Sequence, residues 1–221
     1  MKLLFNAAVK FLIGMAFVFA LLFLPAQTLR FPNAWLFFGL LFIPMLIVGI
    51  ILFIKSPALL AKRLRNKEKQ AAQKGIVALS GLIFLGGFVI SALDFRFSWS
   101  RVPTWLVILA SFVFLIGYAI YAEVMRENAY LSRTVEVNEG QTVIDTGLYG
   151  VVRHPMYLAT LFMFLSIPLI LGSFYGLIPF VLYPVIIVLR IFDEERLLSL
   201  ALDGYTAYKK RVKYRLIPFV F

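Results

Sequence analysis

Long apolar runs separated by short polar segments make up most of this chain of 221 residues. Four of them, at about 8–28, 34–54, 75–93 and 103–122, have the length of about 20 residues that a helix needs to cross a bilayer. A fifth apolar region covers 157–189. The pattern predicts an all-α fold, a polytopic transmembrane helical bundle of four N-terminal helices plus a C-terminal helical hairpin.

Each half of the fifth region is short for a straight crossing. Gly172-Ser173 divides the region into halves of about 16 residues, or roughly 24 Å of helix against a hydrocarbon core about 30 Å thick. We therefore expect a tight hairpin that turns at Gly172-Ser173, with arms bent at Pro168, Pro179 and Pro184.

Composition supports a membrane protein. Hydrophobic residues are 62% of the chain, charged residues are 15%, and the mean hydropathy is +0.92, whereas soluble domains are about 45–50% apolar. Lys2, Lys10 and the run 11–24 resemble a signal peptide, but no small-residue cleavage site follows. We expect a first membrane helix here.

The net charge of +11 is distributed as in a membrane protein and not as in a nucleic-acid-binding one. Three of the 22 Lys and Arg residues (Arg30, Arg96 and Arg101) fall in the links between the first and second runs and between the third and fourth runs, which lie on one side of the predicted membrane. The other nineteen fall in the segments on the opposite side: the N-terminus, a basic loop at 55–74, a polar stretch at 123–153 and the C-terminal region from Arg190 onward. The positive-inside bias predicts that these four segments are cytoplasmic and that the loop contacts anionic headgroups.

We interpret the glycines of the third run and the polar residues after it as structural features without a catalytic role. Gly81, Gly86 and Gly87 in the third run are typical of close helix packing. Asp94, with Arg96, Trp99 and Arg101, is predicted to form a short interfacial turn with an aromatic anchor. The chain has one histidine and no cysteine, so disulfides and the usual zinc sites are excluded and no metal is expected.

The segment 146–157 holds that one histidine. Pro155 is favoured at the first position of a helix, which places Arg153 and His154 at its mouth, and Tyr157 follows close enough to share a site with His154. A histidine that only caps the helix start or contacts headgroups is an equal alternative for His154 alone.

A second polar cluster follows the hairpin. Arg190 and Glu194 share a helix face, and Asp193 and Glu195 flank Glu194. Taken alone, this cluster is more simply an ion pair with solvated acids. The hairpin, however, brings it back beside His154 and Tyr157, and ionisable groups gathered at a membrane boundary indicate a functional site.

Four further tyrosines have two interpretations. Tyr149, Tyr205, Tyr208 and Tyr214 could join this site or form an interfacial aromatic belt. For the last three we expect the belt.

Several motifs in order resemble a known family. They are Gly147-x-Tyr149-x-x-x-Arg153-His154-Pro155-x-Tyr157, Arg190-x-x-x-Glu194-Glu195, Gly204-Tyr205-x-x-Tyr208 and Arg215-Leu216-x-Pro218. The chain from Thr134 onward resembles the isoprenylcysteine carboxyl methyltransferases, which are integral-membrane enzymes similar to the phospholipid N-methyltransferases. The first four runs match only in hydrophobicity and spacing.

The resemblance implies S-adenosylmethionine as cofactor, bound without a Rossmann domain, and no Gly-x-Gly-x-x-Gly follows a strand here. We expect one integral membrane domain over 1–221, with four helices in 1–122 and a catalytic region in 123–221 that contains the hairpin at 157–189. The implied cofactor contacts are Gln141, Thr142, Val143, Ile144, Tyr149, His154, Pro155, Met156, Tyr157 and Glu194. Arg190 matches the substrate-side arginine, so Arg190 and Glu194 are the expected catalytic pair.

One departure is Ala159, where many relatives carry glycine, which puts the width of the pocket in question.

The expected chemistry is methyl transfer to a lipophilic acceptor that enters from the bilayer. An acceptor carboxylate is ionised at neutral pH and needs no base, and Arg190 can orient it. An acceptor amine needs a base, for which His154 and Glu195 are candidates.

Two other functions stay open. The Arg-His-Pro-x-Tyr turn and the ending Val212-Lys213-Tyr214-Arg215-Leu216-Ile217-Pro218 are also similar to membrane sterol reductases, which use NADPH, although this chain is shorter than those enzymes. A non-catalytic scaffold or transporter subunit is the third possibility. Mid-helix charges typical of a transport path are scarce in the sequence.

Overall fold

The computed structural model describes residues 2–64, 71–128, 130–131 and 140–221, without the side chains of 71–74. These residues form helices and no strand. The elements are α1 (Lys2–Ala26), α2 (Pro32–Lys55), α3 (Pro57–Leu64), α4 (Ala71–Phe97), α5 (Thr104–Glu127), the 3-10 turn η1 (Gly147–Gly150), α6 (Pro155–Ile170), α7 (Leu177–Phe180), α8 (Tyr183–Ala201) and α9 (Tyr205–Arg211).

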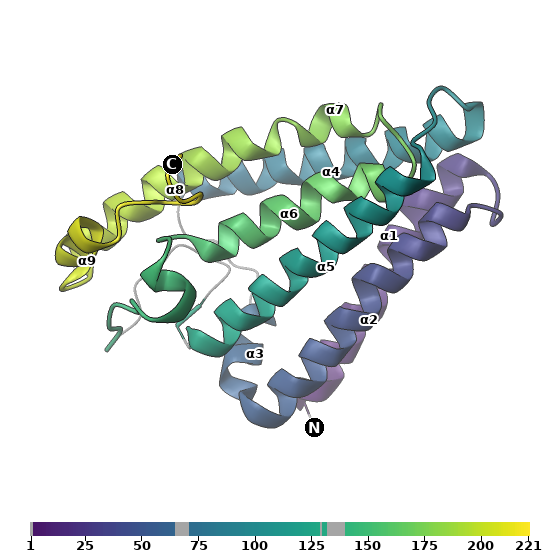
Figure 1. The fold of residues 1–221 in the computed structure, drawn as a ribbon. Coiled ribbons are helices and arrows are strands. Elements are labelled where there is room, and N and C mark those ends of the chain that lie inside the picture. Colours follow the sequence, from purple (N-terminus) through teal and green to yellow (C-terminus); the bar gives the residue numbers. More distant parts are fainter. Residues whose placement is uncertain (1, 65–70, 129, 132–139) are drawn as a thin grey trace.

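The predicted helical bundle is confirmed. Within the described residues, four helices are long and apolar enough to cross a membrane, and they lie in α1, α2, α4 and α5. The C-terminal hairpin follows, with α6 as its first arm and α7 and α8 as its second (Figure 1). Gly172 has a φ of 82°, which a residue without Cβ adopts freely, so the turn forms where it was expected.

The structure corrects three details of the prediction. The basic loop contains α3, whose Leu59 and Leu60 are buried, and α4 begins at Ala71. The second arm of the hairpin is interrupted between α7 and α8, just before Pro184. Arg65, Lys67, Glu68, Lys69 and Arg133 lie outside the described residues, as does the side chain of Lys74.

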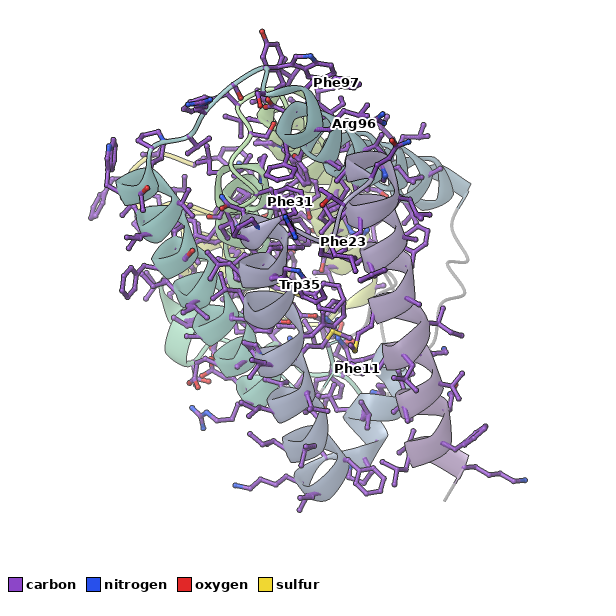
Figure 2. The ribbon with its side chains drawn as sticks, turned by 90° about the vertical axis from the view of Figure 1, so that its right-hand side faces the viewer. Phe11, Phe23, Phe31, Trp35, Arg96 and Phe97 are labelled. Carbon is purple, nitrogen blue, oxygen red and sulfur yellow. The ribbon has the colours of Figure 1, made fainter. Side chains whose placement is uncertain are left out.

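Aromatic side chains fill the core between the helices. Phe23 of α1 lies 4.8 Å from Trp35 of α2 and 6.4 Å from Phe31, measured between ring centroids (Figure 2). The core continues through Phe37, Phe114 and Phe180, each fully buried. Without a hydrophobic driving force between helices in lipid, such close packing is what holds a bundle together.

The links between helices gather at two opposite ends of the bundle. At the end of the bundle where the hairpin turns, Asn33 Nδ2 donates to the carbonyl oxygen of Ile170 at 2.9 Å. Asp94 Oδ1 accepts from the N–H of Ser100 at 2.6 Å, and its Oδ2 accepts from Ser173 Oγ. Asp94 was expected in the interfacial turn, but it lies in the last turn of α4, where it is fully buried.

At the other end lie the N-terminus, α3, the end of α5, the start of α6 and α9 (Figure 1). Lys10 Nζ donates to the carbonyl oxygen of Leu64, and Arg63 lies 5.2 Å from the ring of Tyr121. These are the segments that the charge distribution assigns to one side of the membrane. That this side is cytoplasmic stays a prediction.

The glycine that allows the closest helix approach is not one of those singled out by sequence. A Cβ on Gly117 of α5 would lie 2.9 Å from the carbonyl oxygen of Ala159 and 2.7 Å from Met163, both on α6. Gly87 does face another helix, because a Cβ there would overlap the ring of Phe180. Gly81 and Gly86 have no described atom within 4 Å of the Cβ position, so the packing role predicted for them is wrong.

We predict that Gly117→Ala lowers the stability of the bundle, because its methyl group must displace the backbone of α6. Overpacking of this kind costs about 1–3 kcal/mol. Gly81→Ala is the matched control, and it should leave stability unchanged or raise it, since alanine is the better helix former. Thermal unfolding of both variants in detergent tests this, and equal melting temperatures would contradict the assigned α5–α6 contact.

Candidate functional site

The segment before α6 is shaped by its contacts with α5 and with the C-terminal tail. The carboxylate of Glu127, the last residue of α5, accepts from Thr146 Oγ1 at 3.1 Å and from the N–H of Leu148 at 3.3 Å. It occupies the place that a Cβ on Gly147 would need, and Gly147 has a φ of 49°. Glycine is therefore required at this start of the motif.

Residues 153 and 154 then pair with the tail by backbone hydrogen bonds. The N–H of Arg153 donates to the carbonyl oxygen of Tyr214 at 2.9 Å, and the N–H of His154 donates to that of Arg215 at 2.8 Å. Helix α6 begins at Pro155, as predicted. Proline suits this position because the backbone N–H of the first helical residue has no hydrogen-bond partner within the helix. The ring of His154 stacks on that of Tyr157, with centroids 5.6 Å apart.

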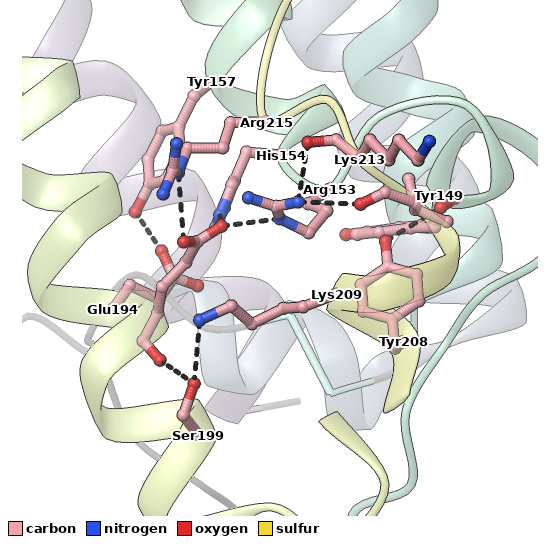
Figure 3. Close-up of polar contacts among 12 residues, drawn as sticks. Tyr149, Arg153, His154, Tyr157, Glu194, Ser199, Tyr208, Lys209, Lys213 and Arg215 are labelled. Carbon is pink, nitrogen blue, oxygen red and sulfur yellow. Dashed lines mark hydrogen bonds and ion pairs between the residues drawn. The ribbon is translucent and has the colours of Figure 1, made fainter. Parts of the chain in front are cut away.

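Glu195 of α8 is the centre of a buried ion cluster. Arg153 Nε donates to its Oε1 at 2.6 Å, Arg215 Nε donates to its Oε2 at 3.1 Å, and His154 Nε2 lies 3.3 Å from Oε1 (Figure 3). Arg153 also donates from Nη1 to the carbonyl oxygens of Val212 and Lys213. The cluster therefore ties α8, the start of α6 and the tail together.

The charge of Glu195 is stabilised by these partners. Burial by itself raises the pKa of this carboxyl, but hydrogen bonds from His154 and Arg153, together with the electrostatic interactions with these two residues, outweigh burial and lower the pKa to about 2. Glu195 is thus an anchor that holds its neighbours, and it is poorly suited to act as a base at neutral pH.

A second chain of contacts runs through the hydroxyl of Tyr157. Arg190 Nε donates to this hydroxyl at 3.0 Å. The hydroxyl in turn donates to Glu194 Oε2 at 2.6 Å (Figure 3). Arg190 and Glu194 lie on the same face of α8, one turn apart, as their spacing predicts. Tyr157 fixes both side chains from the facing arm of the hairpin.

These side chains line a first cavity of about 890 Å³, open solvent at its mouth included. All eleven site residues predicted from sequence lie on its wall: Gln141, Thr142, Val143, Ile144, Tyr149, His154, Pro155, Met156, Tyr157, Arg190 and Glu194. The wall also contains Asn128, Tyr130, Leu131, Arg153, Leu198, Leu202, Tyr205 and Tyr208. The structure therefore brings every predicted site residue together at the meeting point of the two hairpin arms.

Two of the added residues had been assigned to an aromatic belt, and that prediction is wrong. Tyr205 and Tyr208 of α9 are 4% and 3% exposed. The hydroxyl of Tyr208 donates to the carbonyl oxygen of Tyr149 at 2.8 Å. Their spacing of three residues, which places both on one face of a helix, was the sequence signal for a shared role.

A second cavity adjoins the first. Met156, Tyr157 and Arg190 line both cavities, and the rest of the second wall comes from α3, α4, α5, α6 and α8 through Arg63, Ser80, Tyr121, Thr160, Tyr183, Ile186 and Ile187. Its volume is about 550 Å³, measured in the same way. Tyr157 and Arg190 thus stand between a cavity at the α9 end and one among the apolar helices.

Ala159 does not affect the width of either cavity. It is fully buried, it faces Gly117 in the contact between α5 and α6, and it is absent from both cavity walls. The departure from glycine at this position therefore concerns helix packing, and the question it raised about the pocket is answered.

Comparison with known proteins finds similarity of parts of this chain to a methyltransferase family and to a sterol reductase. Residues 105–202 match the family model described as phospholipid methyltransferase. The mouse Delta(14)-sterol reductase TM7SF2 is 35% identical over 92 residues, which cover 40% of this chain and 22% of that protein. The chain thus matches about a fifth of the length of that relative. The family match, together with the four long apolar helices, supports an integral membrane protein with a methyltransferase-like region.

We predict that Glu195→Gln strongly destabilises the protein near neutral pH. Removing one partner of a buried ion pair costs about 3–5 kcal/mol, because the remaining charges stay buried. The folded-state pKa of about 2 lies below the reference value of 4.5, so the stabilisation by Glu195 is complete above about pH 4.5 and is lost as the pH falls toward about 2.

Melting temperatures of the wild type and Glu195→Gln, measured in detergent between about pH 7 and about pH 2.5, test both parts of this prediction. The difference should be largest at neutral pH and should shrink in acid. A difference that is small at every pH would show that the cluster does not stabilise the fold.

Proposed function

We propose that this protein is an S-adenosylmethionine-dependent methyltransferase of the membrane that transfers a methyl group to a lipophilic acceptor. The observation that carries the proposal is the meeting of the two cavities at Met156, Tyr157 and Arg190. One cavity would hold the methyl donor and the other would admit the acceptor from among the helices. The match of residues 105–202 to phospholipid methyltransferases supports the same class of reaction.

The lining of the first cavity has the chemistry to hold the methyl donor. Glu194 offers a carboxylate to the cationic or hydroxyl-bearing parts of the donor, and the rings of Tyr149 and Tyr157 offer faces that attract a cation. We expect the backbone segment 141–144 and the turn from His154 to Tyr157 to complete the site.

The bound cofactor supplies an activated methyl group on a positively charged sulfur. The residues of this chain hold the methyl donor and the acceptor in the orientation that the transfer needs. Tyr157 holds Arg190 on one side and Glu194 on the other through its hydroxyl. Arg190 can therefore orient an acceptor while Glu194 holds the donor. Alignment of two reactants in an enclosed site can lower the activation free energy by up to about 7–11 kcal/mol.

The site favours an acidic acceptor over an amine. A carboxylate is already ionised at neutral pH and needs no proton removed, and the guanidinium of Arg190 can bind it through two donors. An amine acceptor needs a base, and the pKa of about 2 makes Glu195 unsuitable, which leaves His154. We infer that the acceptor resembles a prenyl-cysteine carboxylate, with a phospholipid amine as the alternative within the same class.

We place the site at the cytoplasmic surface, with both termini on that side, in a multi-pass protein. The methyl donor is charged and soluble, and nineteen of the 22 Lys and Arg residues fall in the segments that the charge distribution assigns to the side of the first cavity. The second cavity, lined by Tyr183, Ile186 and Ile187 among others, would receive the lipophilic part of the acceptor.

A reductase is the second candidate, and the similarity to the mouse sterol reductase is the observation in its favour. Titration of the purified protein with S-adenosylmethionine and with NADPH separates the two functions. We expect binding of S-adenosylmethionine, and tighter binding of NADPH would overturn the methyltransferase proposal.

We predict radiolabelled methyl transfer from S-adenosylmethionine to a prenyl-cysteine analogue in reconstituted vesicles, with less transfer to phosphatidylethanolamine. Transfer to phosphatidylethanolamine alone would select the N-methyltransferase alternative. Transfer to neither acceptor, combined with no binding of the methyl donor, would favour a non-catalytic protein.

Titration of Glu194→Gln with S-adenosylmethionine tests the site. Loss of a charge-assisted hydrogen bond of about 1.5–3 kcal/mol should weaken cofactor binding about ten- to a hundredfold. Glu123→Gln is the matched control, because Glu123 pairs with Arg126 on α5 and lies on neither cavity wall. Equal binding by the two variants would contradict the role of Glu194.

We also predict that Ser80→Phe obstructs the second cavity. It should raise the KM for the acceptor about tenfold or more and leave the affinity for the methyl donor unchanged, because Ser80 lines only the second cavity. Ser111→Phe is the control, since both serines donate to the carbonyl oxygen four residues earlier and Ser111 lies on neither wall. An unchanged KM in Ser80→Phe would rule out this acceptor route.

A further inference from the structure

Tyr205 carries an unsatisfied hydroxyl inside the protein. In the part of the chain that the structure describes, Tyr205 Oη is the buried side-chain polar atom without a hydrogen-bond partner. The side chain belongs to α9 and forms part of the wall of the first cavity. Buried polar groups of native proteins almost always have a partner, so this exception needs an explanation.

The neighbouring tyrosine shows that α9 can satisfy such a group. The rings of Tyr205 and Tyr208 are 5.7 Å apart, and both residues are buried to the same degree. The hydroxyl of Tyr208 donates to the backbone of Tyr149 and so fixes α9 against η1. The hydroxyl of Tyr205 has no such structural task, although the two residues share a helix face.

The surroundings of Tyr205 restrict what could satisfy it. Burial raises the pKa of this hydroxyl, and the negative charges of Glu195 and Glu194 raise it further, so at neutral pH the group keeps its proton. This proton is therefore available for a hydrogen bond to an acceptor. A ligand carboxylate would meet the same negative charges that hold the proton in place, which favours an uncharged acceptor.

The ring itself lies among apolar side chains. Tyr205 packs in one buried cluster with Leu202, Tyr208 and Val212, with Val143 and Leu198 against it. Leu198, Leu202 and Val143 also line the first cavity. This part of the wall suits a flat, uncharged group, while Met156, Tyr157 and Arg190 form the part that adjoins the second cavity.

We propose that Tyr205 is a binding residue of the first cavity whose hydroxyl donates a hydrogen bond to the adenosine part of the methyl donor, at a ring nitrogen or a ribose oxygen. The identity of the ligand rests on the proposed function. The role of Tyr205 comes from its own environment, and its position lies beyond the matched region 105–202. The adenosine end of the donor then lies toward α9, and its sulfur lies toward Tyr157 and Arg190.

Binding of S-adenosylhomocysteine to the wild type, Tyr205→Phe and Tyr208→Phe tests the proposal, with calorimetry for affinity and thermal unfolding for stability. Tyr205→Phe should bind S-adenosylhomocysteine about five- to tenfold more weakly, as expected for one lost hydrogen bond. Its melting temperature without ligand should equal or exceed that of the wild type. Tyr208→Phe should melt lower without ligand, because it leaves a backbone carbonyl without its donor.

Methylthioadenosine, which keeps the adenosine and lacks the amino-acid part, tests which end of the ligand Tyr205 contacts. Measured by competition with radiolabelled S-adenosylhomocysteine, its affinity should fall by the same factor in Tyr205→Phe. If only S-adenosylhomocysteine binds more weakly, the contact is with the amino-acid end and the assignment to adenosine is wrong.

The binding and unfolding measurements distinguish failure of the inference about Tyr205 from failure of the proposed function. If the wild type binds S-adenosylhomocysteine and Tyr205→Phe binds it equally well, the inference about Tyr205 fails and the proposed function stands. If Tyr205→Phe melts as low as Tyr208→Phe without ligand, the hydroxyl has a structural partner and the inference again fails alone. If the wild type binds no S-adenosylhomocysteine, both proposals fail.

Discussion

The buried carboxylate of Glu195 is the interaction on which the C-terminal half depends. It accepts hydrogen bonds from Arg153, which precedes α6, and from Arg215 in the tail, so one side chain of α8 joins three segments that are distant in sequence. A buried charge is tolerated only when charged and hydrogen-bonding partners compensate it. Loss of one partner therefore destabilises the whole cluster. His154 and Tyr157 owe their positions on the first cavity to this anchor and to the backbone pairing of residues 153 and 154 with the tail.

The hairpin explains why the cavities lie where they do. Its two arms bring Tyr157 of α6 against Arg190 and Glu194 of α8. The hydrogen bonds through the Tyr157 hydroxyl hold these two side chains in place relative to each other. The turn itself is secured at the far end, where Asp94 accepts from Ser100 and Ser173. Both ends of the hairpin are thus fixed by buried carboxylates. In a site that acts by alignment, such rigidity serves the proposed reaction directly.

The two cavities draw on different parts of the chain. The first is built almost wholly from residues after Asn128, which include much of the region similar to phospholipid methyltransferases. The second takes Arg63 from α3 and Ser80 from α4, which precede that region. On the proposed function, the donor site belongs to the shared part of the chain, and the N-terminal helices contribute to the choice of acceptor.

The sequence by itself determined the long helices, the hairpin and the eleven residues that the structure brings to the first cavity. Runs of apolar residues specify membrane-length helices, because backbone groups in lipid must be satisfied within the segment, and Gly172-Ser173 and Pro155 mark a turn and a helix start by local conformation. Tertiary structure decided the roles of single polar and small residues. Gly81 and Gly117 look alike in sequence, yet only Gly117 meets another backbone. Tyr205 and Tyr208 are both buried, yet only Tyr208 has a hydrogen-bond partner. Asp94 and Glu195 are likewise set by donors that folding brings from elsewhere in the chain, and no local pattern encodes contacts between such distant residues.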